Sequence, residues 1–149
     1  MGHGLPVACG IALGLKLSNT PGRVFCILSD GEMDCGTTWE SALFAAQHKL
    51  NNLMIFVDVN QWQAMGTTKD ILNTEPLDKK FTAFNWRANR VDGHNHQALH
   101  TIINNHSSKP VAVICDTVKG KGVSFMENEL FWHYGYINEG TYQKAMAEL

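Results

Sequence analysis

The sequence has 149 residues, of which 44% are hydrophobic and 17% are charged, a composition typical of one globular domain. Its net charge of −2 argues against general affinity for nucleic acid, because no excess of basic side chains offsets the phosphates. No apolar run approaches the roughly 20 residues that span a bilayer, no signal-peptide pattern is evident and the four cysteines lack CxxC spacing, so we expect a cytoplasmic protein with reduced thiols.

The first half of the chain alternates helical and strand-like patterns. A helix rich in Ala, Leu and Gly is predicted at 5–17, and a loop of turn-forming residues follows it. An apolar strand is predicted at 23–29. A second apolar run at 53–59 is nearly continuous, which is typical of a parallel strand buried on both faces.

A helix is predicted between these two strands, at 37–49. Residues at i, i+4 and i+7 predict the face of this helix that contacts the core, namely Trp39, Leu43 and Ala46. Thr37 or Thr38 can cap its N-terminus, and Glu40 is placed to complete a capping box.

The second half of the chain continues the alternation. Its predicted elements are a loop (60–68), a short helix within 71–84, a strand (86–91), a helix (95–106), a strand (111–116), a long irregular loop (119–135) and a last helix (141–149). Strands that alternate with helices predict an α/β fold, with a parallel sheet and helices on both faces.

Polar oxygen ligands follow the first two predicted strands. Asp30 comes directly after the first strand, and Asn60 comes directly after the second. Neighbouring parallel strands bring such residues to the same edge of a sheet, where α/β proteins bind ligands. A carboxylate, an amide oxygen and a nearby carbonyl suit Mg²⁺ held together with substrate phosphates, and Gly31 lets the backbone approach a diphosphate closely. The stretch therefore predicts a Mg²⁺–diphosphate site.

This stretch resembles the thiamine diphosphate (ThDP) motif of transketolase-like enzymes, in which an Asp-Gly pair precedes an Asn by about thirty residues. Other segments are similar to the same family: Trp39-Glu40, Ala45-Ala46, Lys49-Leu50, Asn52-Leu53, Asp58-Val59, Asp92-Gly93-His94, the Gly-Lys-Gly loop at 117–122 and Trp132-His133. The resemblance implies a ThDP-binding fold in which 1–149 form one diphosphate-type domain. It also implies that the domain is truncated at its N-terminus relative to the family and that the pyrimidine domain is absent.

The resemblance also implies roles for individual residues. The expected metal ligands are Asp30, Asn60 and the main-chain carbonyl of Trp62. The expected cofactor-binding residues are Gly2, Gly4, Asp30, Gly31, Glu32 and Asn60. Gly2 and Gly4 match a loop that borders the pyrimidine of the cofactor, although a flexible terminus is the alternative. His133 matches a loop histidine that contacts substrate and is the candidate catalytic residue, with an exposed loop histidine as the alternative.

Two positions depart from the family pattern. Ser29 stands where the family usually has Gly, and its hydroxyl could bind phosphate or crowd the site. Cys35 stands where the family usually has an acid that takes part in a carboxylate network between active sites, although Asp34 is adjacent. The second departure bears on the proton link between sites rather than on cofactor binding.

The activity implied by the resemblance is that of a transketolase dependent on ThDP and Mg²⁺, which moves a two-carbon ketol unit from a ketose to an aldose. The family completes its cofactor site with a pyrimidine domain. We therefore expect a C-terminal partner subunit that carries this domain, an oligomeric assembly, and a sugar or sugar phosphate as substrate.

Three alternatives stay open. A deoxyxylulose-phosphate synthase has a similar Gly-Lys-Gly loop, here with Lys119 and Lys121, and pyruvate consumption would distinguish it. A degenerate ThDP-domain module would not catalyse at all. A metal hydrolase could use a zinc cluster of His94, His96 and His100, of which the last two have i, i+4 spacing.

Overall fold

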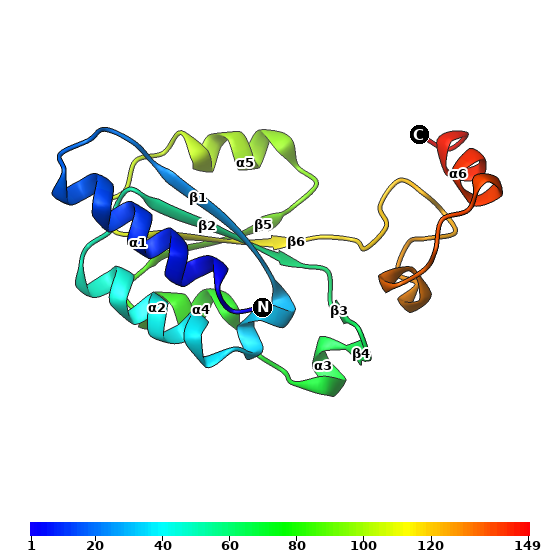
Figure 1. Cartoon of the computed structure of the whole chain (residues 1–149), viewed down its shortest axis with the longest axis horizontal. Coiled ribbons are helices and arrows are strands. Elements are labelled where there is room, and N and C mark those ends of the chain that lie inside the picture. The colour runs from blue at the N-terminus through cyan, green and yellow to red at the C-terminus, as the bar shows by residue number, and fades with distance from the viewer.

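The computed structural model describes residues 1–149 and is built on a four-stranded parallel sheet (Figure 1). Its strands are β1 (Val24–Ser29), β2 (Leu53–Val59), β5 (Arg87–Asp92) and β6 (Val111–Asp116). Their order across the sheet is β1-β2-β6-β5. In this register Ser29 pairs with Asp58, and Val59 pairs with Asp116. The carboxyl ends of β1 and β2 therefore meet at one edge, as the strand predictions required.

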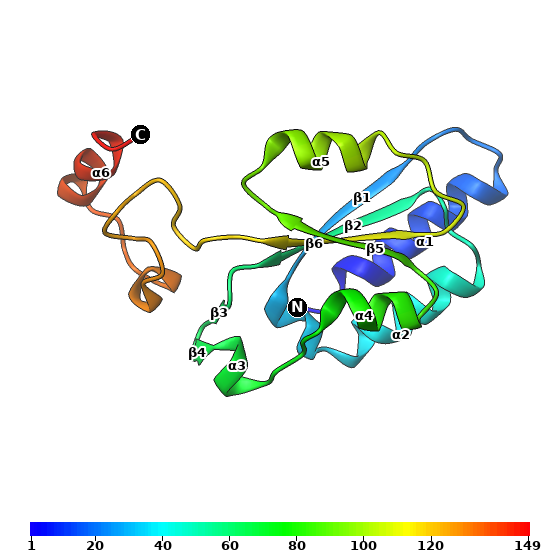
Figure 2. The ribbon, with the colours of Figure 1, turned by 180° about the vertical axis from the view of Figure 1, so that it is seen from behind.

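Helices cover both faces of the sheet, which confirms the predicted α/β class. Three helices lie on one face, namely α1 (Gly4–Leu17), α2 (Gly36–Gln47) and α4 (Leu77–Ala83), and α5 (His96–Ile103) lies on the other (Figures 1 and 2). Each helix lies within about three residues of its predicted range. The alternation of strand and helix was sufficient to place them.

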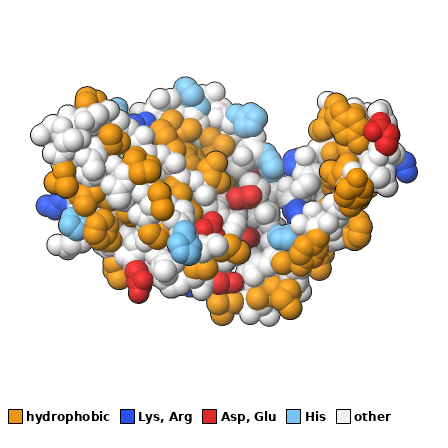
Figure 3. All heavy atoms as spheres, in the orientation of Figure 1, with side chains coloured by type: hydrophobic (Ala, Val, Ile, Leu, Met, Phe, Trp, Pro, Cys, Tyr) orange, Lys and Arg blue, Asp and Glu red, His pale blue; other side chains and the backbone are white.

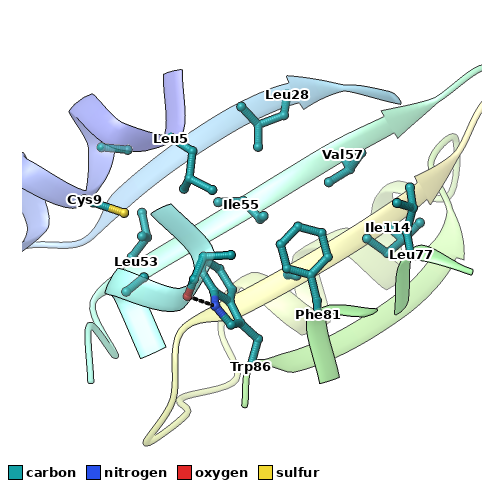
Figure 4. Packing of buried hydrophobic residues seen from close by; sticks show 14 of the residues in the cluster. Leu5, Cys9, Leu28, Leu53, Ile55, Val57, Leu77, Phe81, Trp86 and Ile114 are labelled. Carbon is teal, nitrogen blue, oxygen red and sulfur yellow. Dashed lines mark hydrogen bonds between the residues drawn. The ribbon is translucent and has the colours of Figure 1, made fainter. Parts of the chain in front are cut away.

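The main core lies between the sheet and the three-helix face. Figure 4 labels ten of its buried side chains: Leu5, Cys9, Leu28, Leu53, Ile55, Val57, Leu77, Phe81, Trp86 and Ile114. A smaller cluster fills the α5 face, where Met54, Val113 and Cys115 are buried. Successive residues of a strand point to opposite faces, so β2 and β6 contribute to both clusters and read as continuous apolar runs.

The predicted core face of α2 is confirmed for Trp39 and Ala46, which pack against the core, and is wrong for Leu43. Leu43 is 54% exposed, whereas the buried residues of this helix are small ones: Thr38, Ser41, Ala42 and Ala45. Small side chains let α2 pack closely against α1, and the indole nitrogen of Trp86 donates a hydrogen bond to the carbonyl of Ala42 at 2.8 Å (Figure 4). Close approach of backbone, which apolar periodicity does not report, determines the rotation of this helix.

Several short elements lie in segments predicted as loops. They are the 3₁₀ helix η1 (Asp30–Asp34), the hairpin strands β3 (Trp62–Gln63) and β4 (Gly66–Thr67), the helical turn α3 (Thr68–Ile71) and the 3₁₀ helix η2 (Leu130–His133). The last helix is α6 (Glu139–Met146). None of the helices combines the length and apolar character that crossing a membrane requires.

Residues 117–149, here called the C-terminal arm, extend away from the sheet body after β6 (Figures 1 and 2). The arm carries η2 and α6, and neither has a buried residue. A hollow separates the arm from the body, and acidic side chains lie on the body side of it (Figure 3).

Candidate functional site

The carboxylate of Asp30 is buried at the end of β1. Asp30 is only 4% exposed. One carboxylate oxygen accepts a hydrogen bond from the backbone N–H of Gly31, and the other accepts one from the N–H of Gln61, both at 2.8 Å. Burial nevertheless raises the pKa of Asp30 to about 6, with a further contribution from the nearby charge of Asp58. Desolvation therefore outweighs the two hydrogen bonds.

Asn60 and His133 meet Asp30 at one cavity of about 270 Å³. The residues that line it are Met1, Ser29, Asp30, Gly31, Asn60, Trp62, Gln63, Ala64 and His133. Asn60 follows β2, and its side-chain oxygen accepts a hydrogen bond from the N–H of Trp62 at 2.9 Å. The structure thus brings together the three predicted metal-ligating residues, Gly31 and the predicted catalytic histidine.

The oxygen atoms at this cavity fit a hard divalent cation. Asp30 forms none of the ion pairs in the structure, so its buried charge has no compensating cation among the side chains. Each of its oxygens has one hydrogen bond and therefore a free lone pair. One carboxylate, one amide oxygen and a main-chain carbonyl leave positions for water and phosphate, which is how proteins usually hold Mg²⁺.

A capping box holds the first turn after β1. The hydroxyl of Ser29 accepts a hydrogen bond from the N–H of Glu32 at 3.2 Å, and the Glu32 carboxylate accepts one from the N–H of Ser29 at 3.3 Å. The capping box predicted for α2 is wrong, because Cys35 precedes that helix without a side-chain cap. The Ser29 hydroxyl is thus engaged with backbone and fixes the turn that carries Asp30.

Glu32 and the glycines near the N-terminus lie beside the cavity rather than in its lining. The other oxygen of Glu32 accepts a hydrogen bond from the N–H of Gly2 at 3.0 Å. The hydroxyl of Thr37 donates to the carbonyl of Gly2 at 2.8 Å. Gly4 is exposed and begins α1. Glu32 and Gly2 therefore support the wall of the cavity, and their role in binding the cofactor stays a prediction.

Two polar contacts near the cavity were missed by sequence reasoning. The side-chain amide of Gln63 donates to the carboxylate of Asp34 at 2.9 Å, and the hydroxyl of Tyr134 donates to the carbonyl of Ala64. Both involve the β3–β4 hairpin. Gly66 was the available signal for a turn here, but strands of two residues are too short for periodicity to detect.

The remaining predicted candidates lie elsewhere. His94 accepts a hydrogen bond from the N–H of Val118 at 2.9 Å, and the ring of His100 contacts Asn104 on its own helix. No group of three or more His, Cys, Asp or Glu side chains is placed to hold a metal, so the zinc alternative lacks a cluster. Lys121 pairs with Glu127 at 3.5 Å.

Comparisons with known proteins agree with the fold. Residues 16–144 match the model of the transketolase, thiamine diphosphate binding domain. A transketolase from Campylobacter jejuni has the same fold, with a TM-score of 0.90 over 99% of this chain and 24% of that one, at 23% sequence identity.

Two curated relatives match over the whole of this chain. An apulose-4-phosphate transketolase subunit from Actinobacillus succinogenes is 40% identical, and the 6-deoxy-6-sulfo-D-fructose transketolase subunit SqwG of a Clostridium species is 36% identical. The chain spans 55% of the length of each. Because the family model covers most of the sequence, the chain belongs to the transketolase family, as part of its thiamine diphosphate-binding domain.

Proposed function

We propose that this chain forms the diphosphate side of a ThDP- and Mg²⁺-dependent transketolase, which transfers a two-carbon ketol unit from a ketose to an aldose. The observation that carries the proposal is the shared cavity of Asp30, Asn60 and His133. It combines a buried, unpaired carboxylate with a neutral oxygen ligand and an imidazole. The matching family domain binds thiamine diphosphate, which is the cofactor we propose for this cavity.

Each residue at the cavity has a proposed task. Asp30, the Asn60 amide oxygen and the Trp62 carbonyl would hold Mg²⁺, which in turn would bind the diphosphate. Gly31 presents no side chain to that group. His133, on the C-terminal arm, would hydrogen-bond the substrate and hold or release a proton at one of its oxygens. ThDP, when bound, supplies the electron sink that allows the carbon–carbon bond beside a ketose carbonyl to break and form.

The relatives support an anionic ketose as the substrate class. One is named for apulose-4-phosphate and the other for 6-deoxy-6-sulfo-D-fructose, and both names describe sugars that bear a charged phosphate or sulfonate group. Both relatives are also named transketolases. This favours ketol transfer over the pyruvate-consuming reaction of a deoxyxylulose-phosphate synthase.

A partner chain is part of the proposal. Both relatives are named as subunits, which supports an enzyme divided between polypeptides. The single diphosphate-type domain formed by residues 1–149 would then meet a pyrimidine domain supplied by a separate polypeptide, and turnover would require the oligomer. Mixing the chain with the candidate partner should yield ThDP-dependent ketol transfer that neither has alone.

Calorimetric titration of ThDP with Mg²⁺ tests the site directly. Asp30→Asn should weaken binding by at least about 100-fold, the upper end of what loss of an outer-shell metal partner costs. Glu40→Gln is the matched control, because it also removes one negative charge but lies on the exposed face of α2. Equal affinities of the wild type and Asp30→Asn would refute the assignment. Absence of binding in the wild type, with the partner subunit present, would favour the degenerate module instead.

A further inference from the structure

The histidine proposed for catalysis reaches the cavity from outside the sheet body. His133 ends η2, which belongs to the C-terminal arm. The other cavity residues belong to the segment before α1, the turn after β1 and the loop after β2. The position of His133 relative to Asp30 therefore depends on how η2 is attached to the body.

The attachment of η2 to the body centres on the β3–β4 hairpin. The hydroxyl of Tyr134 donates a hydrogen bond to the carbonyl of Ala64, in the turn between β3 and β4, and η2 contacts β3. The other side-chain hydrogen bond near η2 runs from the indole nitrogen of Trp132 to the carbonyl of Phe125, at 2.9 Å, and stays within the arm. Tyr134 thus makes the side-chain hydrogen bond that joins η2 to the body.

The hairpin is itself fixed to the proposed metal loop. The N–H of Thr68 donates to the carbonyl of Gln61 at 3.0 Å, which closes the base of the hairpin. The amide of Gln63 reaches Asp34 at the end of η1, at 2.9 Å. The carbonyl that Tyr134 contacts is therefore held in a fixed relation to the turn that carries Asp30.

Tyr134 also contacts the imidazole of His133 directly. The two rings are 5.3 Å apart between centroids and meet edge to face at 72°. His133 makes no side-chain hydrogen bond in the structure, so its neighbour's ring and the cavity wall are what orient it. Tyr134 therefore acts on the His133 imidazole in two ways. Its hydroxyl is bonded to the hairpin, and its ring packs against the imidazole.

We propose that Tyr134 is a positioning residue that fastens η2 to the β3–β4 hairpin and so holds His133 at the cavity. The contact between Tyr134 and Ala64 stands on its own geometry, whereas its consequence for turnover rests on the proposed function. Tyr134 is 68% exposed. A single exposed hydrogen bond shifts a local equilibrium by only about three- to tenfold, so its loss should loosen η2 without unfolding the chain.

The chain offers a matched pair of variants. Tyr134→Phe removes the hydroxyl and keeps the ring, whereas Tyr136→Phe makes the same change two residues later, at a side chain that is 84% exposed and has no hydrogen bond. Hydrogen exchange at short labelling times, measured on peptides covering 130–135 and 62–67, needs no cofactor. Exchange in both peptides should become about three- to tenfold faster in Tyr134→Phe and stay unchanged in Tyr136→Phe. Equal exchange in the two variants would overturn the proposal.

A paramagnetic probe then tests the position of His133 itself. Mn²⁺ added with ThDP should broaden the NMR signals of both the Gly31 amide and the His133 ring, because such broadening falls steeply with distance. Tyr134→Phe should weaken the broadening of His133 and keep that of Gly31. Broadening of Gly31 with identical His133 signals in both variants would refute the positioning role alone. Absence of broadening at Gly31 would refute the proposed metal site and leave the exchange result to decide on Tyr134.

With the partner subunit present, kinetics separate positioning from folding. Tyr134→Phe should lower kcat about three- to tenfold, in line with the loss of one hydrogen bond, with the affinity for ThDP unchanged. A loss confined to ThDP affinity would contradict the assignment, because Tyr134 touches none of the proposed metal ligands. Tyr136→Phe should retain the wild-type kcat.

Discussion

The buried charge of Asp30 makes a prediction about stability that is independent of any activity. Burial raises the pKa of this carboxyl from an ordinary value of 3.8 to about 6 in the folded chain. One pKa unit corresponds to about 1.4 kcal/mol, so ionised Asp30 lowers the free energy of unfolding at pH 7 by about 3 kcal/mol relative to a neutral side chain. Asn is the neutral side chain of the same shape. Its NH2 group, however, cannot accept one of the two N–H hydrogen bonds that the carboxylate accepts, which costs about 1–3 kcal/mol at every pH. The gain appears in the pH dependence: between pH 4 and pH 7, Asp30→Asn should gain about 3 kcal/mol of stability relative to the wild type.

The sign of the effect follows from the direction of the pKa change. A carboxyl with a raised folded-state pKa favours folding below its unfolded value of 3.8, where both states are protonated, and loses that advantage as the pH rises through about 6. The difference between Asp30→Asn and the wild type should therefore be constant below pH 4, should shift in favour of Asp30→Asn between pH 4 and 6, and should be constant again above pH 7. Either a proton or a metal ion would neutralise the buried charge of Asp30.

Urea denaturation at several pH values, without Mg²⁺ or ThDP, measures this difference. Glu40→Gln is again the control and should change the free energy of unfolding by less than about 0.5 kcal/mol, as exposed substitutions do. Saturating Mg²⁺ and ThDP should stabilise the wild type and not Asp30→Asn. If the difference did not change between pH 4 and pH 7, the carboxylate would already be compensated within the chain. The buried charge of Asp30 would then need no cation.

Two further predictions concern the wall of the cavity and the binding of metal. Gly2→Ala should destabilise the chain by about 1–3 kcal/mol in thermal or urea denaturation, because Gly2 has a φ of +78° and a Cβ would lie 2.7 Å from the Thr37 hydroxyl. Gly10→Ala, at an open position on α1, should instead stabilise it by about 0.5–1 kcal/mol, and a loss of stability there would contradict the packing described. Mn²⁺ binding, followed by electron paramagnetic resonance without ThDP, should weaken by up to about tenfold per pH unit below pH 6, because a proton on Asp30 competes with the cation. Binding that is flat down to pH 4 would exclude Asp30 as a ligand.

The sheet and the position of the proposed metal site were predictable from the sequence. β2 and β6 are buried on both faces, so their apolar runs are long and have sharp ends at Val59 and Asp116. Ligand-bearing residues that follow such ends meet at one sheet edge because the strands are parallel and adjacent. The register of a parallel sheet thus converts a linear spacing, from Asp30 to Asn60, into proximity.

The details around the site were not predictable, for two physical reasons. Side-chain caps compete at neighbouring positions: Thr37 could have capped α2, but its hydroxyl donates to Gly2, which lies far away in the sequence. The hairpin that carries Gln63 has strands of only two residues, and it is held by contacts to η1 and to Tyr134 rather than by its own pattern. Contacts between distant segments decide both, and no local window contains them.

The two departures from the family pattern have different consequences once the hydrogen bonds are known. Ser29 adopts an extended backbone with a φ of −93°, which needs no glycine, and its hydroxyl is engaged by the N–H of Glu32. Ser29 therefore gives no argument for a degenerate site. Cys35 does remove an acid, and the adjacent Asp34 has one oxygen bonded to Gln63 while the other is buried without a partner. The carboxylate that precedes Cys35 in the sequence is thus tied to the cavity hairpin of its own chain by one oxygen, while its other oxygen is free to accept a hydrogen bond.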